Sequence, residues 1–165
     1  MTTTESRTDE LLVAHLLRRA GFGGTSAELS HLAQLDYEQA VDQLLDAIDS
    51  TSMPQDIIRR YHIDMSDLRT RPSSSGNWLY QMVNTDAPFV EKVNLFWHRV
   101  FATGQTKLIQ GKAMSTQLDM FRKYGLGSFD ELLLKLSKDP AMILWLDNQD
   151  NHKGEINENY GREIL

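Results

Sequence analysis

The feature that most constrains this chain is the spacing of its apolar residues, which recur every three or four positions between helix start and stop signals. Residues 8–19 place four apolar side chains on one helical face, those of Leu12, Val13, Leu16 and Leu17. A glycine-rich turn at residues 21–24 then ends the segment, since glycine is the usual residue just past a helix end. Almost no segment shows apolar and polar residues at alternate positions, the pattern of a β-strand. The sequence therefore predicts an all-α fold.

Three residue pairs have the form of a capping box, in which a polar side chain and a Glu or Gln three positions later bond each other's backbone. These pairs are Thr25 with Glu28, Asp36 with Gln39, and Ser128 with Glu131. Each pair precedes an apolar run of helical period. The sequence therefore predicts helices that begin just after residues 25, 36 and 128.

Proline and glycine positions divide the rest of the chain. Pro72 and the serine-rich residues 73–76 indicate a loop. Further helices are predicted at residues 56–61, 77–84, 88–103, 112–124, 129–136, 141–146 and 159–165. We therefore expect an irregular multi-helix bundle of about seven to nine helices, forming a single domain or sub-domain over residues 1–165 in which residues 1–8 are disordered.

Composition excludes several classes of function. The 165 residues carry a formal net charge of −6, and an acidic chain without a basic face repels nucleic-acid phosphates. The absence of cysteine excludes disulfides and thiolate metal sites. No apolar run reaches the length of a membrane span, and the polar start lacks the pattern of a secretory signal. We therefore expect no nucleic-acid partner, no membrane span and a cytoplasmic location.

The last predicted helix, over residues 159–165, reaches Leu165 without a stop signal. We therefore expect the chain to be a truncated piece of a larger helical protein, with the remainder of that longer chain as its first partner.

Residues 147–163 hold the densest group of polar side chains. Carboxylates and amides of this kind bind ligands or hard divalent cations. Glu158 and Arg162 stand four positions apart and share one helical face. The alternative is a solvated loop whose side chains cap the backbone, with Asn157 as a helix N-cap. The predicted binding residues are Asp147, Asn148, Asn157, Asn159 and Glu163, together with Arg18 and Arg19 beside the glycine turn.

His98 lies on the aromatic helix predicted for residues 88–103. A neutral imidazole can bind a metal or transfer protons. The alternative is a core histidine that donates one hydrogen bond. Arg18 and Arg19 also have two interpretations. They form an anion site near a helix start, or they are solvated side chains at a corner between two helices.

Three stretches carry a family resemblance. Residues 15–24 read His-Leu-Leu-Arg-Arg-Ala-Gly-Phe-Gly-Gly, and residues 95–103 read Leu-Phe-Trp-His-x-x-Phe-Ala-Thr. Residues 139–163 run from Asp-Pro-Ala-Met through Leu-Asp-Asn to Asn-Glu-Asn-Tyr-x-Arg-Glu. In this order and spacing, the chain resembles the large bacterial family known as domain of unknown function 1800, from about residue 15 to its last residue.

The resemblance implies site residues rather than an activity. His98 matches the histidine of the Phe-Trp-His motif. The last motif is matched by Asn157, Glu158, Asn159, Arg162 and Glu163. Family members are longer, and many look exported. No established activity comes with the family.

Two hypotheses of function follow. In the first, the chain is an enzyme or part of one, with His98, Glu158 and Arg162 as catalytic residues. A divalent metal would be its cofactor, held by His98, Glu158 and Glu163. In the second, the chain is a non-catalytic helical interaction or scaffold module that binds another protein. The sequence leaves open whether the chain is an enzyme.

Overall fold

The computed structural model describes residues 2–49, 55–61, 63, 67–108 and 111–164. Within these ranges every element is helical, apart from one isolated bridge between His152 and Glu155. The predicted all-α, multi-helix class is therefore confirmed. The chain forms two compact units, one of residues 1–53 and 81–92, the other of residues 54–80 and 93–165. The single domain or sub-domain stays a prediction.

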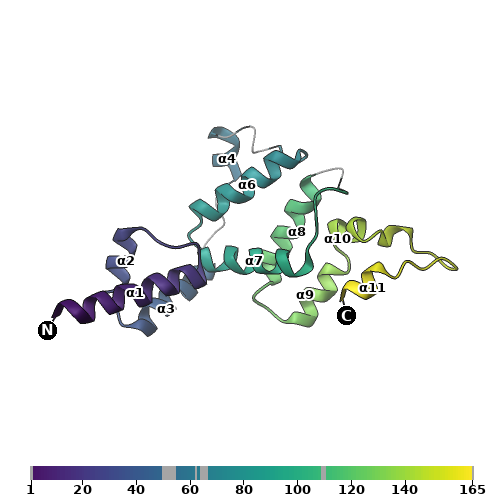
Figure 1. Cartoon of the computed structure of the whole chain (residues 1–165). Coiled ribbons are helices and arrows are strands. Elements are labelled where there is room, and N and C mark those ends of the chain that lie inside the picture. The colour runs from purple at the N-terminus through teal and green to yellow at the C-terminus, as the bar shows by residue number, and fades with distance from the viewer. Residues whose placement is uncertain (1, 50–54, 62, 64–66, 109–110, 165) are drawn as a thin grey trace. The chain divides into compact units, whose positions relative to one another are not determined.

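The first unit contains α1 (Thr2–Ala20), α2 (Ser26–Leu32), α3 (Tyr37–Asp46) and η1 (Ala47–Asp49). Figure 1 shows α2 and α3 against α1. Their apolar faces meet in a core of Val13, Leu17, Leu32 and Ala40. Helices as short as α2 and α3 are marginal alone, so this shared burial stabilises them.

The turn after α1 is fixed by glycine. The helix begins at Thr2, earlier than the predicted start at residue 8, and ends at Ala20 as the glycines predicted. Gly23 has a φ of 101°, and its amide donates to the Leu17 carbonyl at 3.2 Å. Glycine adopts such a positive φ without strain. A Cβ at Gly24 would lie 2.5 Å from Leu17 Cδ1, so the turn packs directly on the core.

Two of the three predicted capping boxes are confirmed. Thr25 and Glu28 bond each other's backbone at 3.3 and 2.6 Å, and Asp36 and Gln39 do so at 2.9 and 3.3 Å. The third predicted capping box is wrong, because its side-chain hydrogen bonds to the backbone are absent. Ser128 occupies the N-cap of α9 (Phe129–Leu136), but its hydroxyl donates to the Asp130 carboxylate instead of capping the backbone.

The second unit contains α4 (Gln55–Tyr61), α8 (Gly111–Tyr124), α9, α10 (Pro140–Trp145), η2 (Asn148–Asp150) and α11 (Asn159–Ile164). It also contains residues 71–80 of α6 (Arg71–Asn84) and residues 93–101 of α7 (Pro88–Phe101). Helix α8 contacts both α9 and α10. Among the described helices, none is both long and apolar enough to cross a lipid bilayer.

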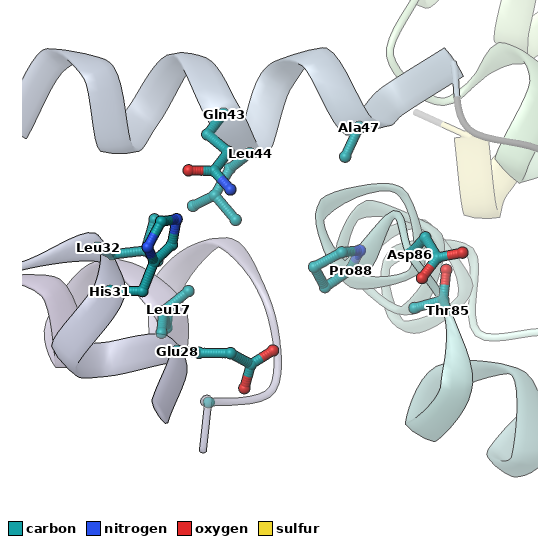
Figure 2. A pocket seen from close by; sticks show the side chains of 11 residues that line it. Leu17, Glu28, His31, Leu32, Gln43, Leu44, Ala47, Thr85, Asp86 and Pro88 are labelled. Atoms are coloured by element: carbon teal, nitrogen blue, oxygen red, sulfur yellow. The ribbon is translucent and has the colours of Figure 1, made fainter. Parts of the chain in front are cut away.

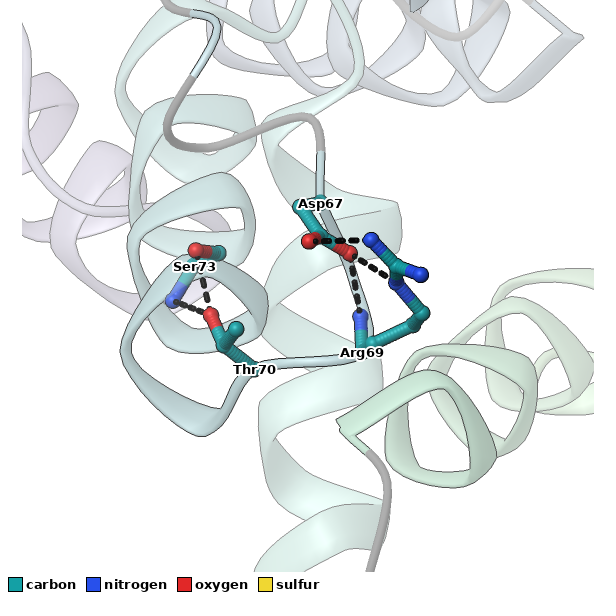
Figure 3. A network of polar contacts seen from close by, with 4 residues as sticks. All are labelled: Asp67, Arg69, Thr70 and Ser73. Atoms are coloured by element: carbon teal, nitrogen blue, oxygen red, sulfur yellow. Dashed lines mark hydrogen bonds and ion pairs between the residues drawn. The ribbon is translucent and has the colours of Figure 1, made fainter.

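The loop predicted at Pro72 and residues 73–76 is wrong, because α6 begins at Arg71 and runs through the serines. Thr70 caps this helix, as its hydroxyl accepts the Ser73 amide at 3.4 Å and donates to the Ser73 hydroxyl at 2.6 Å (Figure 3). Pro72 falls in the first turn, where a missing amide hydrogen costs little. Ser74 is buried and bonds the Gly111 carbonyl and the Ser115 hydroxyl. Packing therefore selects a helix that the polar composition alone did not indicate.

Trp97 on α7 anchors the larger core of the second unit. Its indole Nε1 donates to the Gly125 carbonyl at 2.7 Å, and its ring stacks on Phe101 and Phe129 with centroids 5.6 and 5.7 Å apart. A Cβ at Gly125 would lie 2.8 Å from Trp97 Cδ1. The glycine that ends α8 therefore also makes room for the indole.

We predict that Thr25→Ala lowers the free energy of unfolding by about 1 kcal/mol, because the substitution removes a capping bond. Ser128→Ala should cost clearly less, because Ser128 makes no such bond. Urea unfolding followed by circular dichroism measures both changes, and equal losses would contradict the assignment of the caps.

Candidate functional site

A shallow recess of about 620 Å³ runs along the carboxyl-terminal segment of the second unit. It is formed by η2, the loop that follows, and the first turns of α11. Its lining residues are Asn148, Asn151, Ile156, Asn157, Glu158, Tyr160, Gly161 and Arg162. The structure therefore brings together four of the site residues predicted from the sequence, namely Asn148, Asn157, Glu158 and Arg162.

Asparagine side chains fix the loop that forms the recess. Asn151 donates from its amide to Asn148 Oδ1, and its own Oδ1 accepts the Asn157 backbone amide. Asn157 Oδ1 in turn accepts the Asn159 amide at 2.9 Å. Because α11 begins at Asn159, Asn157 stands two positions before the helix, and its side chain bonds the backbone of the first turn from there. These hydrogen bonds occupy side-chain amide groups of the asparagines within the loop. The groups that remain to bind a ligand are therefore mainly the charged side chains of Glu158 and Arg162.

The charged part of the recess is a loose pair. Arg162 Nη1 lies 3.7 Å from Glu158 Oε1, and the two side chains are 64 % and 81 % exposed. Arg162 also donates from Nη2 to Asn159 Oδ1 at 3.1 Å, and its Nε lies 3.9 Å from Glu163 Oε1. Exposed pairs of this kind add little stability. Both charges are therefore available to a ligand at small cost.

Asp147 is a structural residue next to the recess. Its backbone has a φ of 56°, and its carboxylate lies 2.6 Å from Lys107 Nζ, which also donates to the Trp145 carbonyl at 3.0 Å. These contacts hold the end of α10 against the segment before α8. Asp147 is not among the residues that line the recess.

Glu163 lies at a separate, mainly apolar pocket of about 320 Å³. Its lining joins the end of α7 to α10 and is made of Val100, Phe101, Ala102, Met142, Trp145, Leu146 and Glu163. Ala102 has a φ of 45°, a left-handed conformation that costs a side-chain-bearing residue free energy. Backbone strain of this kind is concentrated at functional positions. The lining also combines residues of the second motif, Phe101 and Ala102, with residues of the third, so the two motifs meet at this pocket.

His98 lies in neither of these two linings. Its ring packs edge to face on Trp78, with centroids 5.1 Å apart and planes at 87°. Its Nδ1 is buried and has no hydrogen-bond partner among the described residues. Burial lowers the pKa of His98 below its usual value. The imidazole is therefore held mainly neutral at neutral pH.

The predicted metal ligands do not gather. Among the residues that the structure describes, no three His, Asp or Glu side chains are close enough together to hold a metal ion. His98, Glu158 and Glu163 therefore do not form a ligand set in this structure. Arg18 and Arg19 lie in the exposed last turn of α1, which belongs to the other unit.

Sequence reasoning missed two groups of residues. The first group is Ile156, Tyr160 and Gly161, which line the recess beside the predicted residues. Tyr160 and Gly161 stand within the third motif, which could have indicated them, whereas Ile156 lies outside any recognisable pattern. The second group is a buried polar pair, in which Gln117 donates to Asp139 Oδ1 at 2.7 Å and burial raises the pKa of Asp139. Asp139 was predicted only as a helix start, a role it also has, since it accepts the Met142 amide at 2.9 Å.

The comparison with protein families decides the identity. The model of a family of proteins of unknown function, DUF1800, matches residues 15–165, a span that contains all three motifs. The chain belongs to the DUF1800 family. The resemblance drawn from the motifs is therefore confirmed. No curated protein and no solved structure matches the chain.

The strain at Ala102 leads to a stability prediction. Ala102→Gly should raise the free energy of unfolding by about 1 kcal/mol, because glycine adopts a positive φ without a steric penalty. Ala113→Gly, within α8, is the control and should lower it by about 1 kcal/mol or more. Denaturant unfolding measures both, and a loss of stability in Ala102→Gly would show that the side chain contributes more than the strain costs.

The partly buried His98 leads to a pH prediction. The unfolded chain has a histidine pKa of about 6.5, whereas burial lowers the pKa of His98 in the folded chain. Between these two values the unfolded state binds more protons, so stability falls as the pH falls through this window. His98→Gln should lose less stability than the unchanged chain between about pH 7.5 and about pH 5.5. Equal losses in urea unfolding would contradict this assignment.

Proposed function

We propose that this DUF1800 chain is a binding protein whose carboxyl-terminal recess holds a small zwitterionic ligand of amino-acid type. The observation that carries the proposal is the recess itself, where Arg162 and Glu158 stand 3.7 Å apart among asparagine side chains. An ammonium group and a carboxylate lie similarly close in an α-amino acid. The ligand would therefore exchange one loose pair of opposite charges for two complementary ones.

Each charge of the lining has a matching partner in such a ligand. The Arg162 guanidinium can bind a carboxylate through two parallel N–H donors. The Glu158 carboxylate can accept from an ammonium group. Asn148 lies at the same lining and supplies an amide for further hydrogen bonds. Because Arg162 and Glu158 are joined only loosely, the ligand does not have to break a strong contact first.

A binding role is favoured over catalysis because of where His98 lies. The enzyme hypothesis assigns His98 as the base, and a base must come within hydrogen-bond reach of the reacting proton. His98 packs on Trp78, outside the recess lining. The recess supplies recognition groups, and no contact connects them to the imidazole among the described residues. The proposal therefore gives Glu158 and Arg162 binding roles, and their catalytic roles stay a prediction.

The test is a titration of the full chain with glycine and with L-alanine, followed by amide NMR. We expect saturable shifts of the recess residues, and we expect Arg162→Gln and Glu158→Gln each to weaken binding about tenfold, which is about 1.4 kcal/mol. Glu155→Gln is the matched control, because Glu155 is 82 % exposed, close to the 81 % of Glu158, and lies outside the lining.

Two outcomes would contradict the proposal. The first is the absence of saturable shifts with either amino acid. The second is an equal loss of affinity in Glu155→Gln and Glu158→Gln, which would trace the effect to net charge rather than to the recess.

A further inference from the structure

A second pocket, of about 260 Å³, lies wholly within the first unit. Its lining comes from α1 and the turn after it, α2, the end of α3 with η1, and the turn between α6 and α7 with the first residue of α7. Figure 2 shows His31 and Gln43 pointing toward each other, with Thr85, Asp86 and Pro88 across the pocket from them. Its volume is below the range for drug-sized ligands, so it suits a small group.

The pocket has an apolar wall. Leu17 and Leu32 are buried and Leu44 is half-buried, and all three belong to the core between α1, α2 and α3. Pro88, from the first turn of α7, adds an apolar surface on the opposite side (Figure 2). A short alkyl chain would bury its apolar surface against this wall.

One charge in the lining is fixed in place. Glu28 Oε2 accepts the Thr25 backbone amide at 2.6 Å and the Thr25 hydroxyl at 2.7 Å. These hydrogen bonds lower the pKa of Glu28, the backbone bond most. The carboxylate is therefore ionised and held by the capping box before any ligand arrives. Such preorganisation reduces the cost of binding.

The net charge of the lining is negative. Its ionisable side chains are Glu28, Asp86 and His31, and no lysine or arginine is among the described lining residues. The ammonium group of Lys92, in the same unit, is engaged elsewhere, since it donates to the Arg18 carbonyl at 3.2 Å and lies over the Phe22 ring. A lining with negative net charge and an apolar wall matches a single positive charge at the end of an alkyl chain.

We propose that this pocket binds an alkylammonium group, either a free small amine or the side chain of a peptide lysine. The alkyl chain lies along Leu17, Leu32 and Leu44, and the ammonium group lies toward Glu28 and Asp86. The proposal does not depend on the carboxyl-terminal recess, because no residue is shared between the two linings.

The experiment titrates the full chain with n-butylammonium and with the neutral isostere 1-butanol, followed by methyl NMR of the leucines. We expect saturable shifts with n-butylammonium, and about tenfold weaker binding with 1-butanol. Glu28→Gln removes the charge but keeps a capping box, because Gln also serves at that position. We expect Glu28→Gln and Asp86→Asn each to weaken n-butylammonium binding about tenfold.

Glu38→Gln is the matched control, since Glu38 is an exposed residue of the first turn of α3 and lies outside the lining. Unchanged binding in this control supports the proposal. Nα-acetyl-lysine N-methylamide distinguishes the two sources, because tighter binding than n-butylammonium indicates a peptide lysine and weaker binding indicates a free amine. Equal affinity for 1-butanol, unchanged affinity in Glu28→Gln, or no saturable shift would overturn the proposal.

Discussion

The docking of Trp97 is the interaction on which the second unit depends. Its indole bonds the Gly125 carbonyl at the end of α8 and stacks on Phe101 and Phe129. One side chain therefore ties α7 to α8 and α9, and it packs against the core of Phe121, Leu132, Leu136 and Met142. Gly125 suits this contact because a Cβ there would collide with the Phe121 carbonyl oxygen and would lie 2.8 Å from Trp97 Cδ1.

The recess depends on this core through α11. Tyr160 packs against the core and its hydroxyl bonds Ser137, just after α9. The Lys107–Asp147 contact holds the end of α10, where the recess loop begins. Arg162 and Glu158 are thus exposed side chains on a supported backbone. Such an arrangement favours recognition, since the backbone that carries the two charges is already in place before a ligand binds.

The sequence predicted the helices better than it predicted the site. Thr25, Asp36 and the glycines after α1 act locally, so their roles follow from neighbouring residues alone. Ser74 shows the limit of this approach, because its burial against Gly111 and Ser115 depends on a helix far along the chain. Ser128 shows it again, since a neighbouring carboxylate competes for the hydroxyl.

The sequence by itself determined the family, the all-α class and the polar segment that carries Asn157, Glu158 and Arg162. Only the tertiary structure decided which of these residues share one recess, that His98 packs on Trp78 instead, and that Glu28 and Asp86 line one pocket. The physical reason is the distance along the chain over which each interaction acts. Caps and helical periodicity act over three or four residues, whereas a pocket is formed by segments that meet only when the core is packed.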